Sequence, residues 1–328
     1  MSSSEEKEAL AILLKSKFEI LQKNSWFTIT FDLNTLQLLG KGSFGVVFSA
    51  YHINFKRKIA FKMIESEMGE LKQTIDELLK MKTLKHPGIL EILDYQLIMH
   101  NKLLVVVLIM EQGQMSLKDY FTEKPMGMSE PLLCQTMNAL SSAISYAHQN
   151  KIVHCDIKPG NIILFQNKDA PGFKPKISDW GSAYEFKEFN HNSATKRKDG
   201  MFFTPMFLAP ELHIFEDEKG KNKAGNFFAG DVYALGVTLL CCAGIEMSQL
   251  GGLAGEQDKE CYEMKMKKLL KQLKDKGISE ETVDKINRMI AFEPKERILP
   301  FIENKVIIIL YNFLQMNLIF FITYDYDR

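Results

Sequence analysis

The hydrophobic pattern changes at about residue 113, and this change limits the possible folds more than any other feature of the chain. Before it lie short apolar runs that are typical of strands, at residues 36–39, 46–51, 58–64 and 103–110. A single stretch with helical spacing, around residues 71–78, separates the last two runs. Helical periodicity predominates afterwards, as in residues 133–147 and 232–242. We therefore expect a strand-rich part and a helix-rich part that meet near residues 111–116.

Length and composition fit a globular protein of this kind. The chain has 328 residues, which favours about two domains or lobes. Lys and Arg number 41, and Asp and Glu also number 41, so no basic field indicates a nucleic-acid partner. The cysteines number 5, an odd count, and none has metal-site spacing. Together with a start that does not resemble a signal peptide, this predicts a reducing, cytoplasmic location.

A glycine-rich run lies between two of the predicted strands. It consists of Gly40, Lys41, Gly42 and Ser43, followed after Phe44 by Gly45. A dinucleotide-binding fingerprint needs a strand before the glycines and a helix after them, so this run is a different motif. Its backbone amides are suited to approach phosphates closely, but the same residues also suit a plain hairpin turn.

Two charged residues further along support the phosphate hypothesis. Lys62 stands at the end of a predicted strand, where its ammonium group is able to contact nucleotide phosphates. Glu77 lies on the next predicted helix, where it is able to pair with Lys62. Each residue alone would more commonly be a solvated surface charge.

The densest group of polar residues lies between His154 and Asn161. Asp156 supplies a base for a hydroxyl group, and Lys158 supplies a cation for a transferring phosphoryl group. Asn161 offers an oxygen ligand for Mg²⁺, and Asp179 offers a second one shortly afterwards. This combination predicts phosphoryl-transfer chemistry.

Four further motif positions follow in the chain, in the order Thr204, Ala209-Pro210-Glu211, Asp231 and Arg297. Taken together at these spacings, the motifs resemble those of eukaryotic-type protein kinases. The lysine two residues after Asp156, and the threonine and proline before Ala209, resemble the serine/threonine branch.

The resemblance implies the α+β, two-lobed protein-kinase-like fold, with an antiparallel small-lobe sheet of about five strands and one helix. Residues 1–31 are then an N-terminal helical extension, and residues 32–299 are the kinase domain. Within it the small lobe covers about 32–110, and the mainly helical large lobe about 114–299. Residues 300–328 form a hydrophobic C-terminal tail. The extension is expected to dock on the small lobe, although partner binding is the alternative.

The resemblance also implies roles in catalysis. Asp156 is expected to be the catalytic base, and Lys158 to stabilise charge on the γ-phosphoryl group. Lys62 is expected to contact the α- and β-phosphates with Glu77 as its ion-pair partner, and Thr204 to steady the catalytic loop. The expected magnesium ligands are Asn161 and Asp179.

ATP is the expected cofactor, together with Mg²⁺. The resemblance places the glycine-rich loop, Gly40 to Gly45, over its phosphates. The residues expected around the adenine are Val47, Ala60 and Ile163, Met110 as gatekeeper, and the backbone of Glu111 and Gly113. Glu211 and Arg297 resemble the ion pair that supports the larger lobe.

The chain departs from the family pattern beside two of its motifs. Cys155 stands where many protein kinases have an arginine that pairs with a phosphorylated activation segment. We expect segment 182–203 to order without a phosphate. Ser193 and Thr195 are candidate phosphorylation sites beside a basic run, but a flexible basic loop is the more common interpretation of such a charge run. Cys155 itself fits a buried, inert residue better than a redox-sensitive thiol. Trp180 replaces the usual phenylalanine, which we interpret as a packing difference.

The third departure is an uncharged apolar run at residues 306–324. Its length just reaches that of a membrane helix. Three interpretations remain open: a last helix packed on the large lobe, a tail anchor with the kinase on the cytoplasmic side, or a disordered or spurious extension. Three amide side chains in the run count against membrane insertion.

The leading hypothesis is transfer of phosphate from ATP to Ser or Thr hydroxyls of protein substrates. A small-molecule phosphotransferase of the aminoglycoside or choline kinase type is one alternative, because residues 177–180 also match its pattern. A pseudokinase that acts as a binding module is the other. The presence of Lys62, Glu77, Asp156, Asn161 and Asp179 counts against the latter.

Overall fold

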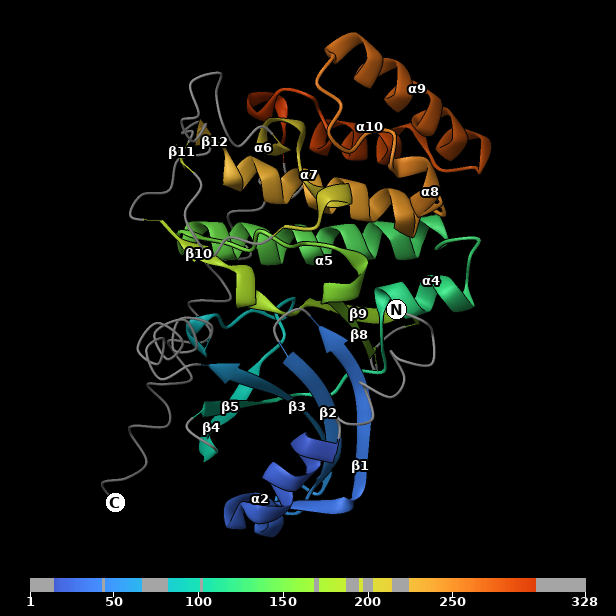
Figure 1. Cartoon of the computed structure of the whole chain (residues 1–328). Helices are drawn as coiled ribbons and strands as arrows, with labels where there is room; N and C mark the ends of the chain where they lie inside the picture. The colour runs from blue at the N-terminus through green and yellow to red at the C-terminus, as the bar shows by residue number, and fades with distance from the viewer. Residues whose placement is uncertain are drawn as a thin grey trace, which may run out of the picture.

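A computed structural model describes residues 15–42, 45–66, 82–100, 103–167, 171–186, 195–196, 203–213 and 224–298. A strand-rich lobe and a mainly helical lobe lie one above the other, and the chain passes between them just after residue 110 (Figure 1). The predicted α+β, two-lobed fold class is confirmed. Predictions on Ser43, Glu77, Ser193, the Thr195 side chain and the tail fall outside the described residues.

The small lobe is built on one antiparallel sheet with the strand order β1-β2-β3-β5-β4. Its strands are β1 (Phe31–Gly42), β2 (Gly45–His52), β3 (Arg57–Ser66), β4 (Ile92–His100) and β5 (Leu103–Met110). The expected number of about five strands is confirmed. The apolar runs predicted three of them closely, whereas β1 is longer than its run and β4 has no matching run.

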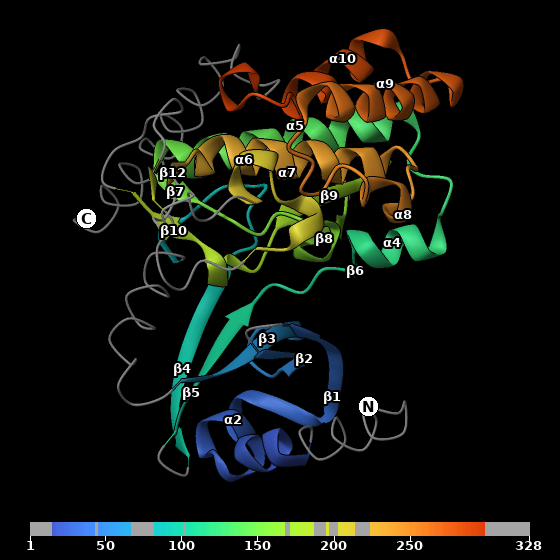
Figure 2. The ribbon, with the colours of Figure 1, turned by 45° about the horizontal axis from the view of Figure 1, so that its top comes forward.

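The N-terminal extension packs on one face of this sheet. Residues 15–23 are helical, and α2 (Ser25–Thr30) follows after Asn24, whose side chain accepts a hydrogen bond from the amide of Phe27 and so caps the helix. Leu21 and Phe27 are fully buried in one cluster with Phe61 of β3. Both views place α2 at the end of the small lobe far from the large lobe (Figures 1 and 2). The docking interpretation is therefore confirmed.

The opposite face of the sheet is apolar as well. Alternate residues of a strand point to opposite faces, so Phe61 and Lys62 of β3 lie on different sides. Leu104, Val106 and Leu108 of β5 form a second buried cluster, and Phe165 of the large lobe packs against it. Both faces of the sheet are thus covered, and the Lys62 side turns toward the large lobe.

The large lobe is organised around two long helices, α5 (Glu130–Gln149) and α7 (Phe227–Cys242). Every residue of α7 is buried, which is the pattern of a central core helix. The other helices are α4 (Leu117–Glu123), α6 (Pro210–His213), α8 (Met247–Leu250), α9 (Lys259–Asp275) and α10 (Glu280–Met289). Figure 2 shows α9 and α10 on the side of α5 and α7 away from the sheet, and α4 on the side nearer to it.

The large lobe also contains short strands and 3₁₀ turns between its helices. The strands are β6 (Met115–Ser116), β7 (Ile152–Val153), β8 (Ile162–Gln166), β9 (Phe173–Ile177), β10 (Tyr184–Glu185), β11 (Thr195–Lys196) and β12 (Ala224–Gly225). The 3₁₀ turns are η2 (Pro159–Asn161), η3 (Trp180–Ser182), η4 (Pro205–Phe207) and η5 (Pro294–Glu296). The backbone amide of Leu90 donates to the carbonyl of Ile177, so the chain before β4 is attached directly to the end of β9.

The predicted ion pair of the large lobe is confirmed. Both guanidinium NH groups of Arg297 donate to the carboxylate of Glu211, each at 2.7 Å. The carbonyls of Ala291 and Phe292 accept from the same guanidinium. Arg297 is buried and fully hydrogen bonded, so it ties the end of the domain to α6.

We expect Arg297→Ala to lower the free energy of unfolding by about 3–5 kcal/mol, because it leaves the carboxylate of Glu211 without its partner. Chemical denaturation of the purified protein measures this change. Glu281→Ala is the control, since the pair of Glu281 with Lys285 is exposed and worth only about 0.3–0.5 kcal/mol. Equal losses in the two variants would contradict the structural role given to Arg297.

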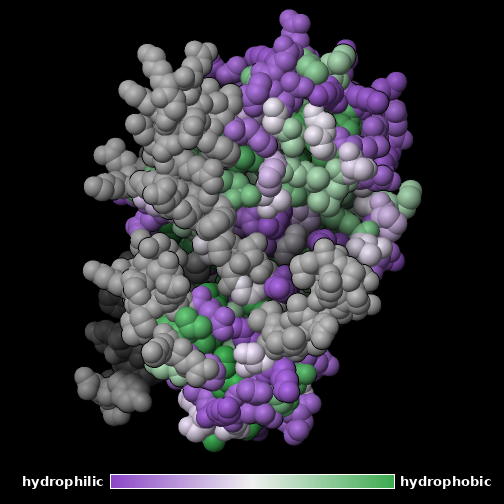
Figure 3. Space-filling view, in the orientation of Figure 1, coloured by the Kyte–Doolittle hydropathy of each residue, from purple (hydrophilic) through white to green (hydrophobic). Residues whose placement is uncertain are grey.

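Among the residues described, no helix is long and apolar enough to span a bilayer. Figure 3 shows that the end of the large lobe carrying α9 is mostly hydrophilic. The run at 306–324 lies outside the described residues, so its three interpretations stay open, as do the predicted domain boundaries.

Candidate functional site

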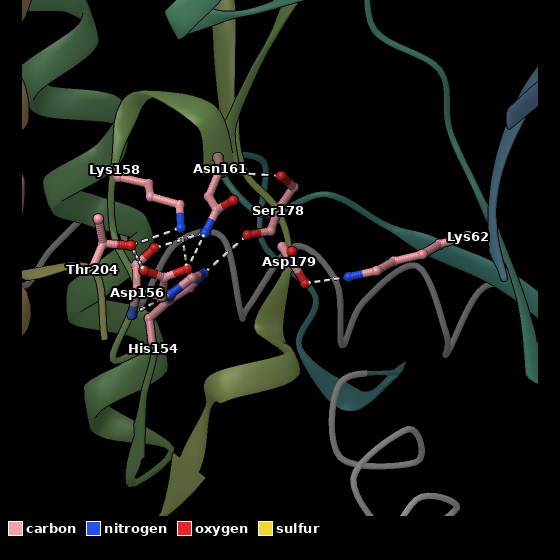
Figure 4. A network of polar contacts seen from close by, with 8 residues as sticks. All are labelled: Lys62, His154, Asp156, Lys158, Asn161, Ser178, Asp179 and Thr204. Atoms are coloured by element: carbon pink, nitrogen blue, oxygen red, sulfur yellow. Dashed lines mark hydrogen bonds and ion pairs between the residues drawn. The ribbon is translucent and has the colours of Figure 1, made fainter. Parts of the chain in front are cut away.

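The candidate site lies between β3, which carries Lys62, and two segments of the large lobe, the loop between β7 and β8 and the residues after β9. The expectation that Lys62 ends its strand is wrong, because β3 continues to Ser66. Figure 4 shows Lys62 reaching from the small lobe toward Asp179, beside a group of polar side chains from the large lobe. The group comprises His154, Asp156, Lys158, Asn161, Ser178 and Thr204. The structure thus brings together the residues predicted to act in catalysis and metal binding, except Glu77, which is outside the described part.

The carboxylate of Asp156 is held on both oxygens. Its Oδ1 accepts a hydrogen bond from the hydroxyl of Thr204 at 2.6 Å. Its Oδ2 accepts from Nζ of Lys158 at 2.7 Å and from Nδ2 of Asn161 at 2.9 Å. The Lys158 ammonium also donates to the Thr204 hydroxyl, at 2.8 Å. Such charge-assisted contacts fix the carboxylate in one orientation.

A buried residue of α7 fixes the backbone of this loop. Asp231 accepts hydrogen bonds from the amides of His154 and Cys155, at 2.7 Å and 2.9 Å. Its carboxylate also contacts Nε2 of His148 at 3.0 Å. Cys155 has a φ of 68°, a left-handed conformation that a non-glycine residue adopts only when its surroundings impose it. The sequence analysis named Asp231 as part of a motif but gave it no role.

His154 links this loop to the segment that carries Asp179. Nδ1 of its ring accepts from the amide of Asp156, so the ring proton resides on Nε2, which donates to the carbonyl of Ser178 at 2.9 Å. The ring also packs against Trp180, with centroids 4.6 Å apart. Trp180 is buried, which agrees with the interpretation of this residue as a packing difference.

Asn161 and Asp179 lie on neighbouring segments, because the amide of Ser178 donates to the carbonyl of Asn161 at 2.8 Å. The amide nitrogen of Asn161 is turned to Asp156, which leaves its amide oxygen to a cation. Asp179 adopts a left-handed conformation, with a φ of 58°. An amide and a carboxylate oxygen fit Mg²⁺, which usually takes one or two protein ligands together with substrate phosphates. Within the described residues no cluster of three or more His, Cys, Asp or Glu offers another metal site.

The side chain of Lys62 extends from the small lobe to Asp179, one of the two candidate metal ligands. Its Nζ lies 2.5 Å from Oδ1 of Asp179, and its side chain is almost fully buried. In the sheet Lys62 pairs with Val47 on β2 and with Leu108 on β5. The ammonium group of Lys62 therefore lies between the two lobes, where a phosphate group would be within its reach.

The glycine-rich run forms the end of the β1–β2 hairpin. Gly42 pairs with Gly45, and Gly40 pairs with Val47. Gly45 has a φ of 147°, and a Cβ atom there would lie 2.2 Å from the carbonyl oxygen of Met63. The hairpin therefore needs a glycine at this position, whereas Lys41 is exposed.

Most of the predicted adenine-contacting residues lie on β3, β5 and β8 or on the connection between the lobes, whereas Val47 lies on β2 beside Lys62. Ala60 pairs with Met110 across β3 and β5, and both side chains are buried. Gly113 lies so close to β8 that a Cβ would approach Cγ2 of Ile163 to 2.3 Å. Only a residue without a side chain allows this close contact.

The side chain of Glu111 also takes part in this connection. Its Oε1 accepts a hydrogen bond from Nζ of Lys176 on β9 at 2.5 Å, and another from the amide of Glu91, just before β4, at 3.0 Å. The sequence analysis used only the Glu111 backbone. Because Lys176 and Glu111 are far apart in sequence, no spacing rule pointed to this pair.

The geometry can be compared with known proteins. A family model described as the protein kinase domain matches residues 33–302. The chain belongs to the protein kinase family. The curated relatives described next are 28–29% identical to this chain. A serine/threonine-protein kinase 10 of Danio rerio is 29% identical over 209 residues, which are 63% of this chain and 20% of that protein.

A human SNF-related serine/threonine-protein kinase is 28% identical over 275 residues, which are 81% of this chain and 32% of that protein. A carbon catabolite-derepressing protein kinase of Candida glabrata is 29% identical over 211 residues, 62% of this chain and 30% of that protein. The chain thus spans between 20% and 32% of the length of these curated relatives.

Proposed function

We propose that the protein transfers the γ-phosphoryl group of ATP to Ser or Thr hydroxyls of polypeptides. The observation that carries this proposal is the fixed carboxylate of Asp156, held by Lys158, Asn161 and Thr204 next to the Lys62–Asp179 pair. The family membership and the names of the relatives, which are serine/threonine-protein kinases, support the same reaction.

In this proposal each residue of the site has a separate role in the reaction. Asp156 accepts the proton of the attacking hydroxyl and orients its oxygen. Lys158, beside it, stabilises the charge that develops on the transferred group. Lys62 holds the α- and β-phosphates, and the hairpin of Gly40, Gly42 and Gly45 covers them. When bound, Mg²⁺ held by Asn161 and Asp179 would neutralise charge on the phosphates.

The segment after Thr204 favours a polypeptide over a small-molecule acceptor. It forms a short turn, η4, and then enters α6, where Glu211 is fixed by Arg297. This rigid support directly beside Asp156 is suited to hold an extended peptide. A small-molecule acceptor remains the second hypothesis.

The experiment is a transfer assay with radiolabelled ATP and Mg²⁺, offering casein, myelin basic protein and a panel of small alcohols. Labelled phosphoserine or phosphothreonine is the expected product. Label found only on a small alcohol would favour the second hypothesis. Nucleotide binding without any transfer would favour a pseudokinase.

We further propose that activity does not depend on phosphate in segment 182–203. Cys155 stands where many protein kinases have a phosphate-binding arginine. Burial, together with the carboxylates of Asp231 and Asp156, raises the pKa of the Cys155 thiol well above its usual range. A neutral thiol beside two carboxylates is a poor partner for a phosphate dianion.

We therefore expect phosphatase-treated protein to keep its full transfer rate, measured on the same peptide before and after treatment. Ser193→Ala and Thr195→Ala should behave like the unchanged protein. Mass spectrometry of the treated sample serves as the control for complete dephosphorylation. A loss of activity on treatment, restored by rephosphorylation, would refute the proposal.

A further inference from the structure

An aromatic cluster outside the polar site connects the two ends of the segment that follows Asp179. Phe186, at its start, stacks on Phe227 with ring centroids 6.0 Å apart and an interplanar angle of 25°. Phe203, at its end, stacks on the same ring at 6.0 Å and 11°. Phe227 is the first residue of α7 and is buried. A single ring of the central helix thus contacts both ends of the segment.

Phe203 is directly followed by Thr204, whose hydroxyl donates to Asp156 and accepts from Lys158. The carbonyl of Thr204 also accepts a hydrogen bond from the amide of Phe207, the last residue of the turn η4. Because Phe203 and Thr204 share a peptide bond, a shift of Phe203 would also move the backbone of Thr204.

A small pocket lies beside Thr204. Its lining comes from the catalytic loop, the Thr204 segment and α7, and it includes Cys155, Asp156, Phe203, Thr204 and Phe227. Phe203 and Phe227 therefore lie in the immediate surroundings of the Asp156 and Thr204 side chains.

We propose that Phe227 is a positioning residue for phosphoryl transfer. Its ring fixes Phe203, and Phe203 holds the Thr204 hydroxyl on Asp156. This inference rests on the proposed function, because it concerns the alignment of the same base. It extends that function to a residue that touches neither nucleotide nor acceptor.

The test uses three variants of the full chain. Phe227→Leu and Phe203→Leu keep an apolar side chain but remove the stacked ring, whereas Phe203→Tyr keeps the ring. Because small misplacements of catalytic groups cost up to about 10²-fold, we expect both leucine variants to lower kcat at least about tenfold with an unchanged KM for ATP. Phe203→Tyr should have nearly the same kcat as the unchanged protein.

A double-mutant cycle shows whether Phe227 acts through Thr204. If it does, Phe227→Leu has no further effect on kcat once Thr204→Ala is present, because coupled residues are not additive. Leu273→Ala, at a fully buried position of α9, is the control for general destabilisation. It should lower the thermal midpoint without lowering kcat per folded molecule.

The outcomes separate this inference from the proposed function. An unchanged kcat in folded Phe227→Leu, or multiplicative losses in the double variant, would overturn the positioning role while the unchanged protein remained an active kinase. A similar kcat loss in Leu273→Ala would also overturn it. An unchanged protein that transfers no phosphate would overturn the proposed function, and this inference with it.

Discussion

Asp156→Asn is expected to lower kcat by about 10²- to 10⁴-fold, the usual contribution of a general base, while nucleotide affinity stays nearly unchanged. Asparagine has the same shape as aspartate and keeps an oxygen for one of the donors, Thr204, Lys158 or Asn161. It has no carboxylate to accept the proton of the attacking hydroxyl. The loss should therefore fall on the chemical step and spare binding.

Lys62→Met should give the complementary result. The buried ammonium group of Lys62 lies beside Asp179, so its removal is expected to weaken ATP binding as well as transfer. Titration with a fluorescent ATP analogue separates the two variants. Lys58→Met on the same strand is the matched control, because Lys58 is exposed and contacts Gln37 instead. Equal nucleotide affinity in Lys62→Met and Lys58→Met would contradict the role given to Lys62.

Phe27→Ala is expected to lower the free energy of unfolding by about 3–5 kcal/mol, the range for large-to-small changes in a core. Phe27 is fully buried between Phe31, at 4.6 Å between centroids, and Phe61, at 4.9 Å. Total stabilities are about 5–15 kcal/mol, so this loss would bring the protein close to unfolding. Residues before the family match at 33–302 would thus be part of the folding unit.

Ile29→Ala provides the control for this prediction in the same short helix. Ile29 is 71% exposed, and exposed substitutions usually change stability by no more than about 0.5 kcal/mol. Denaturant unfolding followed by tryptophan fluorescence reports the change, because Trp26 lies beside Phe27 at 5.7 Å. A Phe27→Ala variant as stable as Ile29→Ala would mean that the extension is dispensable for the small lobe.

Local sequence signals predicted the elements in which one pattern dominates. The strand at residues 103–110 was delimited from its continuous apolar run. The fourth sheet strand was missed because Asp94 and Gln96 interrupt its apolar residues. The extension was predicted to be helical, but α2 was not predicted as a separate helix, because it has only six residues and depends on the packing of Phe27.

The candidate site was largely predictable because its residues lie in short, ordered motifs. Asp156, Lys158 and Asn161 are close in sequence, and their hydrogen bonds follow from one tight loop. The contacts that support them join distant segments, and no spacing in the sequence indicates these. Asp231 binding the amides of the loop, and Phe227 stacking on Phe203, became visible only in the folded chain.

The central claim is tested most directly by locating the phosphate transferred from labelled ATP to a polypeptide, with the unchanged protein and Asp156→Asn assayed side by side. The account predicts phosphoserine or phosphothreonine with the unchanged protein, and a loss of at least about 10²-fold with the folded, nucleotide-binding variant. Equal labelling by both proteins, or transfer confined to small alcohols, would contradict it.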